Sequence, residues 1–160
     1  MKSTRQTSRR AALGLLLSAA AAPALAAAPG AGARGPLLKV YKTPTCGCCG
    51  AWVERMRSAG FTRVEIVQLE DLSPVRARLG VSDDYASCHT AVIGGYALEG
   101  HVPPADVARL LKQKPAAVGL AVPGMPIGSP GMEQGGRKQP FDTLLVLKGG
   151  GAKVFARHGA

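Results

Sequence analysis

Four cysteines are the residues of this sequence best suited to chemistry. Cys46, Cys48 and Cys49 lie within the segment TCGCCG at residues 45–50, and Cys88 follows at a distance. Thiolates act as nucleophiles, exchange disulfides and bind soft metal ions. The spacing of these four thiols allows three interpretations: structural disulfides, a redox-active dithiol, and a metal site.

Two structural disulfides are the simplest interpretation, because an even number of cysteines in an exported chain usually forms a disulfide framework. A domain of about 130 residues, however, can generally be stable without disulfides. In addition, the adjacent Cys48 and Cys49 could bridge each other only with strain.

A dithiol oxidoreductase is the second interpretation. Cys46 and Cys49 form a C-x-x-C pair at the start of a predicted helix, which is typical of thiol-disulfide exchange. Cys46 would be the exposed nucleophile and Cys49 the resolving thiol. Cys48 and Cys88 would then be extra thiols beside the redox pair, where they invite mixed disulfides.

Binding of a soft metal ion is the third interpretation. Structural zinc sites usually use two closely spaced cysteine pairs, and this sequence has only one C-x-x-C pair. The C-x-C-C segment is better suited to sulfurs that bridge several metal ions, and Cu(I) is a soft ion that prefers thiolate ligands. Cu(I) is therefore the metal that this interpretation favours.

Hydrophobic periodicity and turn residues predict the elements that must position these cysteines. The expected order is strand, helix, strand, helix, strand, strand, helix. The first six lie at residues 37–41, 51–59, 64–69, 73–80, 90–93 and 96–99, and the last helix opens at Pro103-Pro104. Trp52 and Met56, one helical turn apart, are expected in the core or in a wall of the site.

This order of elements brings the cysteines toward one place. If the first two strands pair in parallel, the turn that carries Cys46 lies at the carboxyl end of the sheet. The loop that ends at Cys88 can enter the next strand beside that turn. The four thiols can then converge, and we expect the helix N-terminus to lower their pKa values.

A long loop and a hairpin are predicted to close the chain. Residues 122–140 are rich in Gly and Pro and show no period, while residues 143–147 and 153–156 flank a Gly-Gly-Gly turn. The loop contains Met125 and Met132, whose thioethers are soft ligands for Cu(I). For both methionines we favour the alternative role of packing the loop onto the domain.

The first 26 residues have the pattern of a secretory signal peptide that is removed near Ala26. Its paired arginines, Arg9-Arg10, resemble a twin-arginine signal. The apolar run that follows has 12 residues, whereas a spanning helix needs about 20. We therefore expect no stable membrane anchor after cleavage, a flexible linker at residues 27–36, and one domain at residues 37–160.

The net charge of the 160-residue chain is +10, and part of it belongs to the leader. Cleavage near Ala26 removes four basic residues and no acidic ones, which leaves +6. The other basic residues are scattered along the sequence and are not interleaved with aromatic residues. We therefore expect no nucleic-acid partner.

Three segments, in this order, resemble the CopG-type family of periplasmic copper-resistance proteins. They are VYKTPTCGCCGAW, SCHTAVIGGYALEGHVPPADVARLL and GLAVPGMPIGSPGME. The resemblance implies an α/β, thioredoxin-like single domain (βαβ-α-ββα) with a C-terminal loop and hairpin. It further implies a cysteine-bridged multinuclear copper site with Cys46, Cys48, Cys49 and Cys88 as ligands, and a role in interconverting copper oxidation states.

Three histidines are secondary candidates. His89 adjoins Cys88 and could bind copper, but side chains alternate along a strand, so we expect the two to face opposite ways and His89 to be structural. His101 is expected to hydrogen-bond within its own turn. His158 is expected to be solvated at the end of the chain.

Together these features predict an exported copper-binding protein that acts in copper resistance, by sequestration or by Cu(I)/Cu(II) redox handling. The expected metal is copper, as Cu(I) in a thiolate-bridged cluster, and the expected partners are copper ions and periplasmic copper donors, acceptors or a redox partner. We expect a metal-binding or electron-transfer protein, with a copper oxidoreductase as the enzymatic alternative. The alternative function is a periplasmic thiol-disulfide oxidoreductase that uses Cys46 and Cys49.

Overall fold

A seven-stranded sheet and three helices make up residues 35–159, the part of the chain that the computed structural model describes. Through the third helix the elements follow the predicted order, with one added 3-10 turn. They are β1 (Leu38–Lys42), α1 (Gly47–Ser58), β2 (Val64–Gln68), α2 (Ser73–Leu79), η1 (Asp83–Tyr85), β3 (His89–Ile93), β4 (Tyr96–Glu99), α3 (Pro104–Gln113), β5 (Ala117–Ala121), β6 (Phe141–Leu147) and β7 (Ala152–His158).

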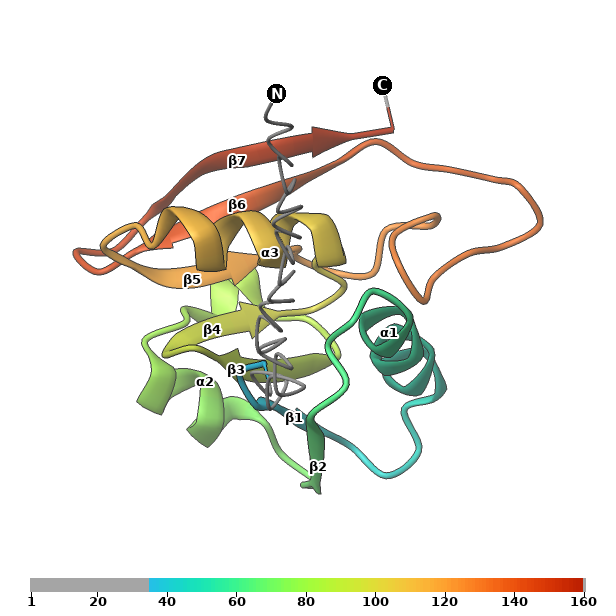
Figure 1. The fold of residues 1–160 in the computed structure, drawn as a ribbon, viewed down its shortest axis with the longest axis horizontal. Helices are drawn as coiled ribbons and strands as arrows, with labels where there is room; N and C mark the ends of the chain where they lie inside the picture. The colour runs from blue at the N-terminus through green and yellow to red at the C-terminus, as the bar shows by residue number, and fades with distance from the viewer. Residues whose placement is uncertain (1–34, 160) are drawn as a thin grey trace, which may run out of the picture. The chain divides into compact units, whose positions relative to one another are not determined.

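The strands form one mixed sheet in the order β2-β1-β3-β4-β5-β6-β7 (Figure 1). β1 pairs in parallel with β2, and β4 pairs in parallel with β5, while the other neighbours are antiparallel. The predicted α/β class is confirmed. The predicted parallel pairing of the first two strands places the turn after β1 at the carboxyl end of both strands.

The core lies on the face of the sheet that bears alternate residues of β1, Leu38 and Val40. Side chains of α1 and α3 pack in the same buried cluster, which includes Trp52, Val53, Met56, Val107 and Leu110. Trp52 and Met56 are fully buried, as predicted. The first helix is therefore fixed by apolar contacts that lie just behind its cysteine-bearing first turn.

Strand β5 was not predicted from the sequence, because its five residues carry few conventional strand signals. Its centre is Gly119, which pairs with Ala97 of β4 so closely that a Cβ atom there would collide with the Ala97 backbone. β5 joins the predicted C-terminal hairpin, β6 and β7, to the rest of the sheet. The predicted loop at residues 122–140 is present and runs from β5 to β6.

The prediction that His158 is solvated is wrong. Its Nε2 lies 2.8 Å from Asp106 Oδ2 and 3.1 Å from Thr143 Oγ1, and its ring stacks on Phe141. The Asp106 carboxylate is itself buried and needs such partners. The polar cluster of Asp106, Thr143 and His158 therefore links β6 and β7 to α3.

The predicted signal peptide at residues 1–26, and the predicted linker up to residue 34, lie outside the described residues. Both remain predictions. Within residues 35–159, no helix is long and apolar enough to cross a membrane.

Candidate metal centre

The first cysteine segment lies where β1 turns into α1. The Cys46 N–H donates to the Thr43 carbonyl in the connecting turn, and Cys46 immediately precedes α1. Cys48 and Cys49 lie in the first helical turn. Backbone N–H groups that lack helical partners point outward at this end of a helix, which favours negative charge there.

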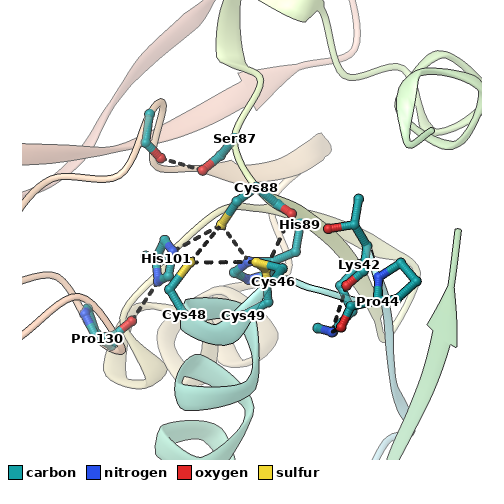
Figure 2. The surroundings of a disulfide bond; sticks show 12 residues. Lys42, Pro44, Cys46, Cys48, Cys49, Ser87, Cys88, His89, His101 and Pro130 are labelled. Atoms are coloured by element: carbon teal, nitrogen blue, oxygen red, sulfur yellow. Dashed lines mark hydrogen bonds between the residues drawn. A yellow bond between two sulfur atoms is a disulfide. The ribbon is translucent and has the colours of Figure 1, made fainter. Parts of the chain in front are cut away.

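The four cysteine sulfurs form one group, because their Sγ atoms all lie within 4.8 Å of one another (Figure 2). Cys46 and Cys49 are joined by a disulfide, while Cys48 and Cys88 are free. Cys48 Sγ lies 3.6 Å from Cys46 Sγ and 3.8 Å from Cys88 Sγ. The predicted convergence of Cys46, Cys48, Cys49 and Cys88 is thus observed, and the interpretation with two structural disulfides is not.

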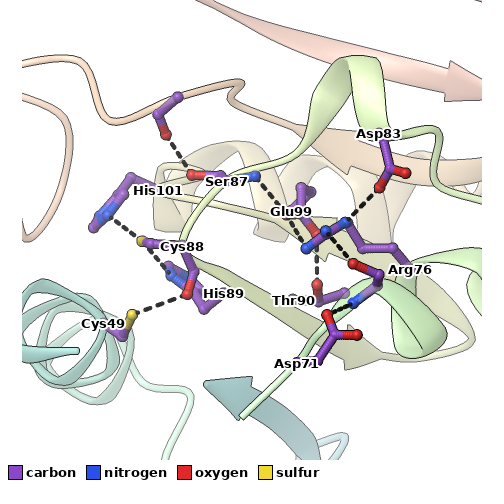
Figure 3. Close-up of polar contacts among 12 residues, drawn as sticks. Cys49, Asp71, Arg76, Asp83, Ser87, Cys88, His89, Thr90, Glu99 and His101 are labelled. Atoms are coloured by element: carbon purple, nitrogen blue, oxygen red, sulfur yellow. Dashed lines mark hydrogen bonds and ion pairs between the residues drawn. The ribbon is translucent and has the colours of Figure 1, made fainter. Parts of the chain in front are cut away.

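A buried carboxylate fixes the loop that carries Cys88. Glu99, at the end of β4, accepts hydrogen bonds from the Ser87 backbone N–H (2.7 Å) and from the Thr90 hydroxyl (2.6 Å) (Figure 3). Burial raises the pKa of this carboxyl, although the two hydrogen bonds and the Arg76 guanidinium act in the opposite direction. Because the two donors flank Cys88 in the sequence, Glu99 holds the loop on both sides of the thiol.

The Cys88 thiol is protonated in the metal-free site. Burial is the main cause, and the neighbouring Cys48 thiol a smaller one, that raises the pKa of Cys88 to about 12. The expectation that the helix N-terminus lowers the pKa values of all four thiols therefore fails at Cys88, which does not belong to the helix. A metal ion that binds Cys88 must displace its proton.

His101 supplies a nitrogen that faces the sulfur group. Its Nδ1 lies 2.8 Å from the Pro130 carbonyl oxygen, which can only accept, so Nδ1 carries the hydrogen. The lone pair of Nε2 is then free to face Cys88 Sγ, 3.1 Å away. Burial lowers the pKa of His101, which keeps the imidazole neutral and able to bind a metal ion. The prediction that His101 bonds only within its own turn is wrong.

His89 also faces the site. Its Nδ1 lies 3.3 Å from Cys88 Sγ, contrary to the expectation that the two side chains face opposite ways. Strand alternation does not apply to this pair, because β3 begins only at His89. The ring packs against Trp52 and against the edge of His101, and ligand atoms of Cys88, His89 and His101 lie within 4.8 Å of one another.

Two solved structures of a copper resistance protein, copG, are similar to this chain over most of its length. Form 2 is 41% identical with a TM-score of 0.74, and Form 1 is 42% identical with a TM-score of 0.73. Each match covers 78% of this chain and 99% of the solved chain. The chain belongs to the CopG family. Residues 85–132 also match the family described as a protein of unknown function, DUF411, and no curated protein sequence matches the chain.

In this CopG-family chain, the loop at residues 122–140 packs around the site. The Gly124 N–H donates to the Ala86 carbonyl, and the Ser87 hydroxyl donates to the Gly124 carbonyl. Further along, Gly131 has a φ of +85° and lies so close to the start of α1 that a Cβ atom would be 2.6 Å from the Trp52 backbone nitrogen. The loop therefore contacts both the segment that precedes Cys88 and the start of α1, which carries Cys48 and Cys49.

The two methionines singled out in the Gly/Pro-rich loop follow Gly124 and Gly131 directly. Met125, next to Gly124, is 51% exposed, whereas Met132, next to Gly131, is partly buried. Met132 closes a tight turn, since its N–H donates to the Ser129 carbonyl. The loop thus holds Met132 near α1 and leaves the Met125 side chain largely in solvent.

The sequence carries a signal for the position of His101, namely the spacing of β3 and β4. The strands predicted at residues 90–93 and 96–99 are joined by Gly94-Gly95, and this two-residue turn pairs Ile93 with Tyr96 and Thr90 with Glu99. Extending that register by two residues places His101 opposite Cys88. Two strands joined by a two-residue turn are therefore sufficient to place this histidine beside the cysteine site of the CopG-family chain.

Proposed function

We propose that this CopG-family protein binds copper through Cys46, Cys48, Cys49 and Cys88, as a thiolate-bridged multinuclear Cu(I) site, and that it acts in copper resistance. It would do so by sequestration, by Cu(I)/Cu(II) redox handling, or by both. Copper ions are its proposed ligand, and periplasmic copper donors, acceptors or a redox partner are the proposed exchange partners.

The observation that carries this proposal is the group of four sulfurs within 4.8 Å of one another. Soft thiolates select Cu(I) over hard cations, and closely spaced sulfurs can each bridge two metal ions. His101 Nε2, 3.1 Å from Cys88 Sγ, adds a nitrogen donor at the edge of the group. The relationship to the copper resistance protein copG supports copper as the metal.

The order of elements supports a thioredoxin-like core, and the predicted leader supports a periplasmic location. We propose that the β2-β1-β3-β4 portion of the sheet, with α1, α2 and α3, is a thioredoxin-like core to which β5, β6 and β7 are added. We also propose that residues 1–26 direct export through a twin-arginine route and are cleaved near Ala26.

The disulfide sets a condition on metal binding. Cys46 and Cys49 cannot both donate thiolates while they are joined, so full occupation of the site requires reduction of this bond. The same bond favours the alternative function, a thiol-disulfide oxidoreductase in which Cys46 and Cys49 exchange electrons with a partner dithiol.

Native mass spectrometry of the reduced, oxygen-free protein, titrated with Cu(I), separates the two functions. We expect more than one copper ion per chain and simultaneous protection of all four thiols, because the sulfurs lie close enough to share metal ions. Weak or absent copper binding, together with reversible formation of the Cys46–Cys49 disulfide, would instead support the oxidoreductase.

Replacing Met125 and Met132 with leucine tests the loop. We expect the Cu(I) affinity to stay within about threefold of the wild-type value, because leucine has a similar volume and preserves packing. Competition with a Cu(I) chelator measures the affinity of each single variant. A loss of more than about tenfold in either variant would make that thioether a copper ligand.

A further inference from the structure

We propose that Gly131 is a positioning residue. It lets the loop between β5 and β6 pack against α1, and so holds the Pro130 carbonyl where it orients His101 as a nitrogen ligand for copper. Neither Gly131 nor Pro130 has a side chain that could bind a metal ion, and neither is in the predicted ligand set. The inference rests on the proposed copper site. Its first readout uses metal-free protein, so its failure can be told apart from a failure to bind copper.

The Pro130 carbonyl determines which nitrogen of His101 can bind a metal ion (Figure 2). Its oxygen lies 2.8 Å from Nδ1 and accepts the hydrogen of that nitrogen, which leaves Nε2 with a lone pair. With the hydrogen on Nε2 instead, this nitrogen would donate to Cys88 Sγ, 3.1 Å away, and could not bind metal. Histidines that bind metals almost always donate their other N–H to such an acceptor, which fixes the tautomer and the ring orientation.

The turn that carries this carbonyl is closed by its own hydrogen bonds. The Ser129 hydroxyl, which is fully buried, donates to the Pro126 carbonyl at 2.7 Å. The Met132 N–H donates to the Ser129 carbonyl at 2.8 Å. Because these bonds lie on both sides of the Pro130–Gly131 peptide, a shift of Gly131 must carry the Pro130 carbonyl with it.

The contact of this turn with α1 requires glycine. Gly131 has a φ of +85°, and a Cβ atom there would lie 2.6 Å from the Trp52 backbone nitrogen and 3.0 Å from the Cys48 carbonyl oxygen. Both are backbone atoms of a helix that the fully buried Trp52 side chain fixes in the core, so the helix cannot move aside. A methyl group at this position must therefore push the loop, and the Pro130 carbonyl, away from His101.

Nitrogen NMR of metal-free, histidine-labelled protein at pH 8 reads the tautomer of His101, with His101→Gln used to assign its signals. We expect the hydrogen on Nδ1 in the wild type and mainly on Nε2 in Gly131→Ala, because the displaced carbonyl no longer accepts it. Gly136→Ala is the matched control. Gly136 lies in the same loop with a φ of +80°, and a Cβ atom there would meet nothing within 4 Å. This control carries similar backbone strain without the displacement, so it should keep the wild-type tautomer.

Competition with a Cu(I) chelator then measures the consequence for the reduced protein. Loss of a partner that orients a metal-binding histidine typically lowers metal affinity by about 10- to 100-fold. We expect the Cu(I) affinity of Gly131→Ala to fall by at least about tenfold, and that of Gly136→Ala to match the wild type. A changed tautomer with unchanged affinity would overturn the positioning role, because His101 would then not be a ligand.

A wild-type tautomer in Gly131→Ala, or the same change in Gly136→Ala, would also overturn the inference. If Gly131→Ala does not fold, Ser129→Ala takes its place, because it removes a hydrogen bond that closes the turn. It should populate the Nε2–H tautomer, and a wild-type spectrum or unfolding of both variants would leave Gly131 a structural role only. Failure of the wild type to bind Cu(I) would instead overturn the proposed function.

Discussion

Replacing Cys88 with serine is expected to lower the Cu(I) affinity of the reduced protein by at least about hundredfold. Groups that merely support a metal ligand change affinity by about 10- to 100-fold, and loss of a ligand should cost no less. Cys88 is the one site cysteine that does not come from the segment at residues 45–50. Its sulfur lies 3.8 Å from Cys48 Sγ and 3.1 Å from His101 Nε2. A hydroxyl there is a poor ligand for Cu(I).

Chelator competition and the copper stoichiometry from native mass spectrometry measure this loss. Ser87→Ala is the matched control, because it alters the neighbouring residue and its hydrogen bond to Gly124 but removes no sulfur. The Cys88→Ser protein should retain disulfide exchange at Cys46 and Cys49. Full copper stoichiometry with unchanged affinity in Cys88→Ser would refute the proposed ligand set.

Local sequence signals were sufficient for most of the fold. Apolar periodicity and turn residues each act within a few residues, and the elements that they predicted through the third helix are present. β5 was missed because Gly119 is a poor strand former in isolation. Its place in the sheet depends on the backbone of Ala97, 22 positions earlier, which leaves no room for a side chain.

The candidate site shows the same difference between residues that local sequence predicts and residues that only tertiary contacts bring in. The four cysteines were predictable because the chemistry of thiols and the position of a strand-to-helix turn are local properties. Glu99 was not, since a carboxylate at the end of a strand usually faces solvent. Here it is buried by the loop of Cys88, which donates to it through Ser87, and it faces Arg76 of α2. Only the tertiary structure brings these partners together.

The metal-free protein is expected to lose stability as the pH falls below about 6.5, largely through His89. Burial is the main cause that lowers the pKa of His89 to about 3, from an ordinary value of 6.5. Below about pH 6.5 the unfolded chain therefore binds a proton at this residue and the folded chain does not. The contribution of His89 to the free energy of unfolding is complete above pH 6.5 and is lost as the pH falls toward 3. One pKa unit corresponds to 1.36 kcal/mol, so between pH 6.5 and 5 this residue alone accounts for about 2 kcal/mol.

Urea unfolding of the disulfide form at pH 7, 6 and 5 measures this effect against His89→Phe. Phenylalanine preserves the aromatic contact with Trp52, and the replaced Nε2 is buried without a hydrogen-bond partner, so the variant loses little at pH 7. His101, whose pKa burial also lowers, titrates in both proteins, so its contribution cancels in the comparison. The difference in unfolding free energy between wild type and variant should therefore shift by about 2 kcal/mol in favour of the variant at pH 5. If the unfolding free energies of the two proteins changed in parallel with pH, the folded chain would bind a proton at His89. That result would contradict the burial of the imidazole behind α1 as the cause of its low pKa.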